Sequence, residues 1–187
     1  LVGLGNPGSN YTNTRHNIGF KIIDAINVHF KLSKQKPKFK GLLTTGNIDE
    51  KKIYAIKPLT FMNNSGTAIK ELIDYFKIDA KDVFVFHDDM DVDFGKIKAK
   101  FGGSSAGHNG IESIDKFIGK EYSRVRIGIG HPKEKKRVNN HVLEDFKDDE
   151  EEKINDITKN IVKQLSTLIE KKIDLFSSKV NQNLNGI

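Results

Sequence analysis

His16 is the first residue whose type and position could support chemistry. It lies in the stretch Leu1–Phe20, LVGLGNPGSNYTNTRHNIGF, where a short apolar run is followed by a turn that contains glycine and proline. Apolar residues then recur at helical spacing as far as Phe30, which predicts that His16 lies near the start of a helix. The partial positive charge of a helix N-terminus opposes protonation of a nearby imidazole, and a neutral imidazole can act as a general base at pH 7. Taken alone, His16 is better explained as a polar residue near a helix cap.

Four loops carry the other polar residues that could join a reaction. These loops span residues 5–17, 61–66, 87–91 and 102–110. Together they offer five candidates: His16, Asp88, Asn6, Asn63 and Asn109. A carboxylate could accept the ring N–H of a neutral histidine, and asparagine amides could bind a peptide group or stabilise an oxyanion. Several of the loops directly follow predicted strands, where ligand sites gather in open α/β sheets.

Covalent and metal-dependent chemistry have weaker support. The chain contains no cysteine, and Ser65 lacks the context of a nucleophile elbow. The run His87–Asp91 could bind a metal, since carboxylates and imidazole are suitable ligands, but no second ligand cluster at a familiar spacing accompanies it. The sequence therefore predicts no metal site, and Asp89, Asp91 and Asp93 are expected to form a solvated acidic turn.

The loop Gly102–Gly110 does not match a phosphate-binding fingerprint. It could be a plain mobile connection or a gate over a substrate. Five cations alternate with apolar residues in two segments near it: Lys96, Lys98, Lys100, Arg124 and Arg126. These cations could form a basic stripe beside the loop or an ordinary solvated strand face, and the pattern leaves both readings open.

Composition fits one globular domain. The chain has 187 residues, of which 36% are hydrophobic and 30% charged. Its longest apolar runs are too short to span a bilayer and no signal peptide is visible, so we expect a cytoplasmic protein without membrane partners. The chain begins at Leu1 inside a predicted strand, so a few upstream residues are expected to be missing. The formal net charge of +6 and the pI of about 9.3 favour a polyanionic partner such as a nucleic acid.

Strands alternate with helices along the chain. Strands are predicted at 1–4, at 41–48 and 52–57 as a hairpin, and at 83–86, 97–101 and 125–129. Helices are predicted after the loops at residues 5–17, 61–66 and 102–110, and a long helix is predicted at 147–176. Residues 32–40 read as a Lys-rich connection, and residues 177–187 as a frayed polar tail. This order predicts an α/β fold in one domain, 1–187, with a mixed β-sheet and helices on both faces.

Five motifs, taken together, resemble one known family. In order they are GLGNPGSNYTNTRHNIGF, PLTFMNNSG, FHDDMD, KFGGSSAGHNG and RVRIGIGHP. From Leu1 to about Pro132 they closely resemble the bacterial peptidyl-tRNA hydrolases. The resemblance implies an enzyme that hydrolyses the ester between a peptide and the 3′-terminal ribose of tRNA, as a monomer and without a metal or other cofactor. A binding protein for RNA that has lost hydrolysis and a metal-dependent hydrolase are the alternatives.

The resemblance also implies roles for single residues. His16 matches the family's catalytic histidine, Asp88 its supporting aspartate, and Asn6 the asparagine linked to discrimination between N-blocked and free aminoacyl-tRNA. Substrate contacts are implied for seven others: Tyr11, Phe61, Met62, Asn63, Asn109, Lys100 and Arg126. Of these, the last two match a basic pair that clamps the 5′-phosphate of tRNA. The chain departs from the family at Ser104-Ser105-Ala106, where relatives are richer in glycine, and at Asn64, where they often carry an apolar residue.

Overall fold

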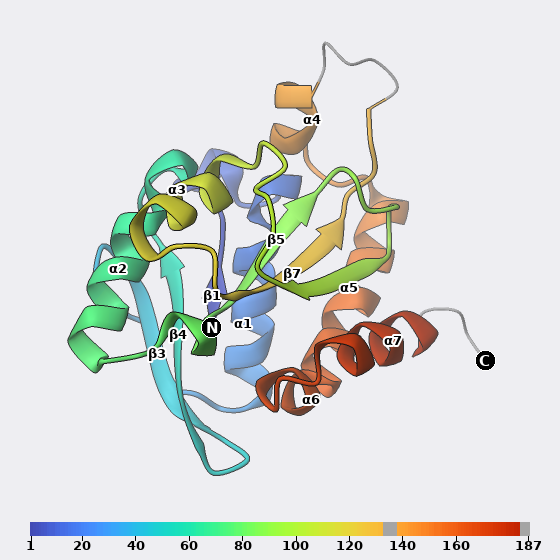
Figure 1. Cartoon of the computed structure of the whole chain (residues 1–187). Coiled ribbons are helices and arrows are strands. Elements are labelled where there is room, and N and C mark those ends of the chain that lie inside the picture. Colours follow the sequence, from blue (N-terminus) through green and yellow to red (C-terminus); the bar gives the residue numbers. More distant parts are fainter. Residues whose placement is uncertain (133–137, 184–187) are drawn as a thin grey trace.

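A seven-stranded mixed sheet runs through the centre of the computed structural model, which describes residues 1–132 and 138–183 (Figure 1). The strands are β1 (Val2–Gly3), β2 (Lys36–Lys38), β3 (Gly41–Ile48), β4 (Lys51–Pro58), β5 (Phe84–Asp89), β6 (Ile97–Phe101) and β7 (Ser123–Gly128). Their order in the sheet is β2-β3-β4-β1-β5-β7-β6. The four central strands, β4, β1, β5 and β7, are parallel, so their carboxyl ends meet at one edge of the sheet. The predicted hairpin is confirmed as the antiparallel pair β3–β4.

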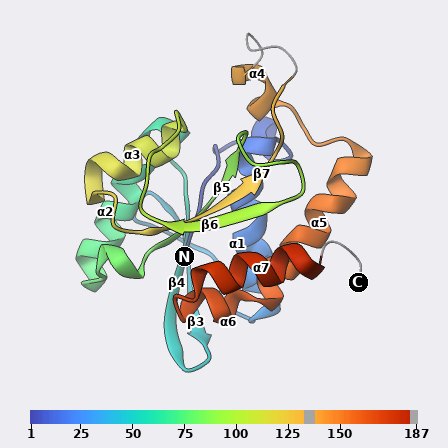
Figure 2. The same ribbon diagram turned by 45° about the vertical axis from the view of Figure 1, so that its right-hand side comes forward.

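Helices cover both faces of the sheet. They are α1 (Ile18–His29), α2 (Ser65–Phe76), α3 (Asn109–Ile118), α4 (Val138–Leu143), α5 (Asp148–Lys163), α6 (Leu165–Ile169) and α7 (Ile173–Asn183). Helices α2 and α3 pack on one face, and α1, α5, α6 and α7 enclose a larger core on the other (Figures 1 and 2). This arrangement confirms the predicted α/β class with helices on both faces. None of the described helices is long and apolar enough to cross a membrane.

The apolar patterns that predicted these elements point into the two cores. In α1, the residues at helical spacing, Ile18, Ile22 and Ile26, are fully buried. Strand β5 is buried along its whole length, as expected of a strand covered on both faces. Its last residues, Asp88 and Asp89, therefore lie at the carboxyl edge of the sheet and are fixed there by the buried strand.

The two outer strands are protected in different ways. At one end of the sheet, β2 is exposed and contains Pro37 between two lysines. At the other end, α7 lies beside β6 (Figure 2). The side-chain amide of Asn181 accepts a hydrogen bond from Ile97 N at 2.9 Å and donates one to Ile97 O at 2.9 Å, and Ser177 Oγ accepts one from Ala99 N at 2.9 Å. Side chains of a helix thus take the place of a neighbouring strand.

The C-terminal part differs from the sequence prediction. The predicted long helix, 147–176, is divided into α5, α6 and the start of α7, and Lys171 between the last two has a left-handed φ of 63°. The segment predicted as a frayed tail, 177–187, is helical as far as Asn183, because Phe176 and Val180 are buried against the core. Residues 133–137 and 184–187 lie outside the described residues. The Lys-rich connection at 32–40 contains β2.

Candidate active site

Close backbone packing brings His16 to the carboxyl end of β5. His16 lies in a 3₁₀ turn, Arg15–Asn17, that leads directly into α1. One turn later, α1 passes over β1 and β5 at Gly19, where an added Cβ would overlap the backbone of Leu4 and Phe86. Only glycine permits this approach, so the packing of α1 sets the position of the histidine.

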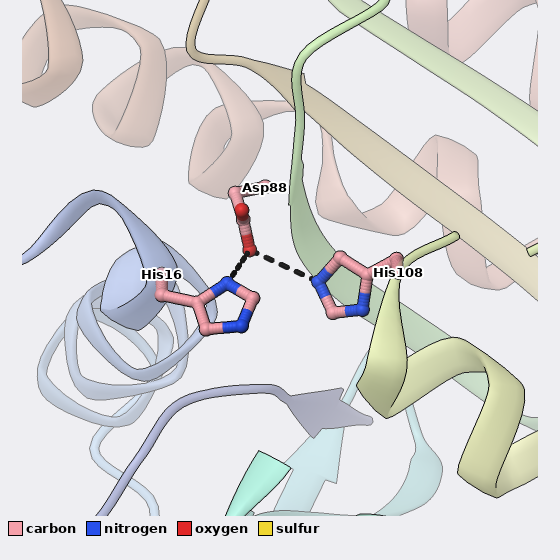
Figure 3. A group of neighbouring side chains, drawn as sticks. All are labelled: His16, Asp88 and His108. Atoms are coloured by element: carbon pink, nitrogen blue, oxygen red, sulfur yellow. Dashed lines mark hydrogen bonds and ion pairs between the residues drawn. The ribbon is translucent and has the colours of Figure 1, made fainter. Parts of the chain in front are cut away.

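His16 and Asp88 form a hydrogen-bonded pair (Figure 3). The distance from His16 Nδ1 to Asp88 Oδ1 is 2.8 Å, and both residues are buried, at 8% and 2% exposure. An ionised carboxylate can only accept, so Nδ1 carries the proton and Nε2 presents its lone pair. This is the tautomer that a general base requires.

Opposing effects set the pKa values of this pair. Burial lowers the pKa of His16, but the charge of Asp88 and its hydrogen bond raise it, and the net shift is upward. The carboxylate in direct contact with His16, rather than the helix N-terminus, therefore sets the direction of the pKa shift. Burial raises the pKa of Asp88, while the two neighbouring histidines lower it far below its usual range. Asp88 thus remains charged whenever His16 is neutral.

His108 is the second partner of Asp88, and the sequence analysis did not single it out. Its Nε2 lies 3.0 Å from Asp88 Oδ1 (Figure 3). Its Nδ1 accepts hydrogen bonds from Gly110 N at 3.1 Å and Ile111 N at 3.3 Å, so the ring caps the N-terminus of α3. These partners fix the tautomer, with the proton on Nε2. The available signal was a histidine directly before a predicted helix, but histidine is not among the favoured N-cap residues.

The three side chains also form a group of potential metal ligands. One atom from each of His16, Asp88 and His108 lies within 4.8 Å of the others. Both imidazoles, however, direct an N–H group at the same carboxylate oxygen, so their lone pairs do not converge on a shared point. In the run that the sequence offered as a ligand cluster, His87 is buried and burial, followed by the charge of His108, lowers its pKa to about 3. Its Nδ1 donates to Asp88 O at 2.7 Å, which leaves it a neutral structural residue.

Asp89 differs from the expected solvated turn. It is only 9% exposed and accepts hydrogen bonds from Arg126 Nε at 2.6 Å and from Asp91 N at 2.9 Å. Burial raises the pKa of Asp89, but the bond and charge of Arg126 give a net downward shift. Asp89 therefore holds Arg126 of β7 through its Nε and leaves the terminal guanidinium nitrogens for another partner.

Asn6 is held rigidly in the loop that follows β1. Its Oδ1 accepts a hydrogen bond from Met62 N at 2.9 Å, so its Nδ2 remains available as a donor. Asn17, which sequence reasoning overlooked, fixes its backbone: Asn17 Oδ1 accepts from Asn6 N at 2.8 Å, and Asn17 Nδ2 donates to Asn6 O at 2.9 Å. Asn17 is adjacent to His16, so the two candidate residues are positioned by one short segment.

The other predicted substrate contacts occupy different environments. A pocket beside His16 is lined by Asp88, by residues 89–91, by residues 105–109 including Asn109, and by Val142 of α4. Tyr11, Phe61 and Asn63 do not line this pocket; the first is half-buried and the other two are exposed, Phe61 by 61%. Met62 is buried in the core against Gly110, so it contributes through its backbone contact to Asn6.

Arg15 is a further residue that the sequence did not reveal. It is 3% exposed, and its guanidinium donates to Asp145 O at 2.7 Å and to Glu150 Oε2 at 2.6 Å. These bonds join the turn that carries His16 to the segment between α4 and α5 and to the first turn of α5. The C-terminal third of the chain therefore supports the site from outside the sequence motifs.

The predicted basic stripe is only partly present. Lys98 is exposed and Lys100 half-buried, and Arg126 faces them from β7. Arg124, by contrast, is 1% exposed and ion-paired with Asp115, so it takes no part in a surface stripe. Partial burial, followed by the charges of Arg126 and Arg124, lowers the pKa of Lys100. Cations that repel one another in this way can be stabilised by a bound anion.

Comparison with known proteins agrees with this architecture. The peptidyl-tRNA hydrolase family matches the chain over residues 1–186. A peptidyl-tRNA hydrolase from Pelagibacter ubique (strain HTCC1062) is 72% identical over 181 residues, which cover 97% of each chain. One from Ehrlichia ruminantium (strain Welgevonden) is 46% identical over 180 residues, which cover 96% of this chain and 92% of the relative.

Solved structures show the same relationship. The crystal structure of peptidyl-tRNA hydrolase from Acinetobacter baumannii superposes with a TM-score of 0.90 at 34% identity, covering 96% of this chain and 92% of that one. Sequence and structure are thus similar along nearly the entire chain, and the protein belongs to the peptidyl-tRNA hydrolase family.

Proposed function

We propose that His16 is the general base in the family reaction, the hydrolysis of peptidyl-tRNA, and that Asp88 orients it. The observation that carries this proposal is the 2.8 Å hydrogen bond from His16 Nδ1 to Asp88 Oδ1, which leaves Nε2 free to accept a proton. Nε2 takes a proton from water, and the resulting hydroxide attacks the ester carbonyl carbon. The bond to the ribose oxygen then breaks, and the imidazolium returns its proton to that oxygen.

The chemistry demanded of this pair is modest. An ester has a better leaving group than an amide, so water can attack without a covalent enzyme intermediate. General-base catalysis supplies about 10²–10⁴-fold, and positioning of water and ester supplies more. Asp88 stays charged throughout and stabilises the imidazolium that forms on His16. The donors Asn6 Nδ2 and Asn109 are suited to hold the peptide group and polarise the ester carbonyl.

The test of this function is release of N-acetylated amino acid from N-acetyl-aminoacyl-tRNA, with and without a chelator. We expect release by the wild type at the same rate in both conditions. Loss of activity on chelation, with recovery on addition of a divalent cation, would instead support the metal-dependent hydrolase. Binding of the tRNA without any release would support the RNA-binding alternative. The substrate is a product of translation, which is consistent with a cytoplasmic site of action.

Asn6 is proposed to select substrates whose α-amino group is blocked. Its Nδ2 can donate to a peptide carbonyl, whereas a free ammonium placed there would be desolvated without an acceptor. Asn6→Asp keeps the acceptor for Met62 N and replaces the donor with a carboxylate that can pair with an ammonium. We expect the ratio of kcat/KM values for N-acetylated and free aminoacyl-tRNA to fall by about tenfold or more, the equivalent of one charge-assisted hydrogen bond. An unchanged ratio would remove Asn6 from this role.

Lys100 and Arg126 are proposed to bind the 5′-phosphate of tRNA. Lys100→Gln should weaken tRNA binding and reduce the slope of log affinity against log salt by about one, because one fewer counterion is released. The loss should be absent for a tRNA without its 5′-phosphate, since that ligand no longer offers the contact. Lys98→Gln, an exposed change on the same strand, is the matched control. Equal effects of Lys100→Gln and Lys98→Gln on tRNA binding would indicate a diffuse electrostatic attraction rather than a specific phosphate contact.

A further inference from the structure

Arg124 stands out because a fully buried guanidinium lies directly behind the loop that forms one wall of the pocket. Its Nη2 donates to Asp115 Oδ1 of α3 at 2.7 Å, and its Nη1 donates to the backbone carbonyl of Ser104 at 2.7 Å. Tyr122 donates its hydroxyl to the same Asp115 oxygen at 2.8 Å, and its ring centroid lies 4.7 Å from the guanidinium. One side chain therefore joins β7, α3 and the middle of the loop.

The loop itself has little regular structure to hold it in place. Four of its residues have positive φ: Gly102, Gly103, Ala106 and Gly107. At its start, the loop is held to the sheet by the hydrogen bond from Gly102 N to Tyr122 O at 2.8 Å. Near its other end, it is held by the hydrogen bond between His108 and Asp88. Between these ends, its own bonds are short-range, from Ala106 N to Ser104 Oγ and from His108 N to Ser105 O. The carbonyl of Ser104 is thus the point where Arg124 ties the centre of the loop to the body.

We propose that Arg124 is a positioning residue that latches the loop 102–107 and so holds residues 105–107 as a wall of the pocket. The latch is strong because the donor is charged and buried, and a charge-assisted hydrogen bond contributes more than a neutral one. It is also specific to arginine, whose planar fork reaches the carboxylate and the carbonyl together, which a lysine ammonium cannot reproduce. The pocket wall is then ordered before substrate arrives, so that binding does not have to order it.

The same geometry excludes Arg124 from direct contact with tRNA. At 1% exposure its guanidinium is covered by α3 and the loop, whereas Arg126, two residues further on the same strand face, keeps part of its side chain accessible. The two arginines should therefore be separable by experiment. Removal of Arg126 should alter the salt dependence of tRNA binding, and removal of the latch should alter loop order and KM.

The experiment compares Arg124→Lys and Tyr122→Phe with the wild type by hydrogen exchange and steady-state kinetics. For Arg124→Lys we expect faster amide exchange in residues 103–107 and a KM for N-acetyl-aminoacyl-tRNA about tenfold higher with little change in kcat, the equivalent of one lost charge-assisted hydrogen bond. The salt slope of tRNA binding should stay at the wild-type value. Tyr122→Phe removes a single bond to Asp115 and should shift exchange and KM in the same direction by less, which keeps the test open if Arg124→Lys folds poorly.

The control is Lys116→Gln, which removes an exposed ion pair on α3 and should change neither exchange nor KM. Unchanged loop exchange in Arg124→Lys would overturn the latch, and so would a salt slope reduced by about one, which would indicate a phosphate contact. The kinetic readout rests on the proposed function, but hydrogen exchange does not. If the wild type showed no hydrolysis, the proposed function would fail. The rate of amide hydrogen exchange in the loop would still test whether Arg124 holds the loop in place.

Discussion

Replacing His16 with alanine is expected to lower kcat by about 10²–10⁴-fold, the usual contribution of a general base. The reason is geometric: His16 Nε2 is the imidazole lone pair that remains open once Nδ1 is committed to Asp88. His108 cannot replace it, because both of its nitrogens are committed, one to Asp88 and one to the amides of α3. The measurement is single-turnover release from N-acetyl-aminoacyl-tRNA.

The control for this variant is tRNA binding. Lys100 and Arg126 lie on β6 and β7 and do not contact His16, so His16→Ala should bind tRNA with near-wild-type affinity and salt dependence. A variant that binds normally but does not turn over places the loss in the chemical step. A near-native single-turnover rate would falsify the assignment of His16 as the base.

Asp88→Asn is expected to change both the rate and its pH dependence. In the proposed mechanism the active form carries neutral His16, so we expect kcat/KM to rise as pH increases through the pKa of this residue. Asp88 raises that pKa, and removal of its charge should therefore move the acid limb of the profile to lower pH. The plateau should fall by about 10²–10⁴-fold, because an amide neither fixes the tautomer as firmly nor stabilises the imidazolium.

Two readouts distinguish this expectation from simple misfolding. The displacement of the acid limb is a property of His16 and would not follow from a lower fraction of folded protein. It can be measured independently by NMR titration of the His16 ring in the absence of substrate. A plateau loss with an unshifted acid limb would mean that Asp88 does not set the charge state of His16.

The local pattern of apolar residues predicted most of the fold, because helices and strands repeat their buried positions at different spacings. The helical spacing in α1 was sufficient to place His16 at a predicted loop–helix junction, and the continuous apolar run of β5 was sufficient to place Asp88 where a predicted strand ends. The predicted topology indicates that the two side chains lie near one another, but it does not give the distance of 2.8 Å between His16 Nδ1 and Asp88 Oδ1. It depends on how closely Gly19 lets α1 approach the sheet, which is a tertiary contact.

The difference between Arg124 and Arg126 could not be predicted from the sequence. Arg124 and Arg126 alternate identically with apolar neighbours, yet α3 and the loop cover the first and leave the second accessible. No local pattern in the sequence indicates which of the two arginines α3 and the loop will cover. Similarly, Asn17 bonds to backbone groups of Asn6, and Arg15 bonds to the backbone carbonyl of Asp145 as well as to the Glu150 carboxylate. Any residue can supply a backbone group, so side-chain pattern gives no indication of these partners.

The contacts of α7 with β6 block one edge of the sheet against pairing with a second molecule. Open sheet edges offer free N–H and C=O groups to a strand from a second molecule and so invite aggregation. Asn181 and Ser177 consume the groups of Ile97 and Ala99 that such a strand would need. At the opposite end, Pro37 offers β2 no N–H group of its own. Edge-to-edge growth of the sheet is therefore opposed at both ends, since neither outer strand readily pairs with a strand of a second copy.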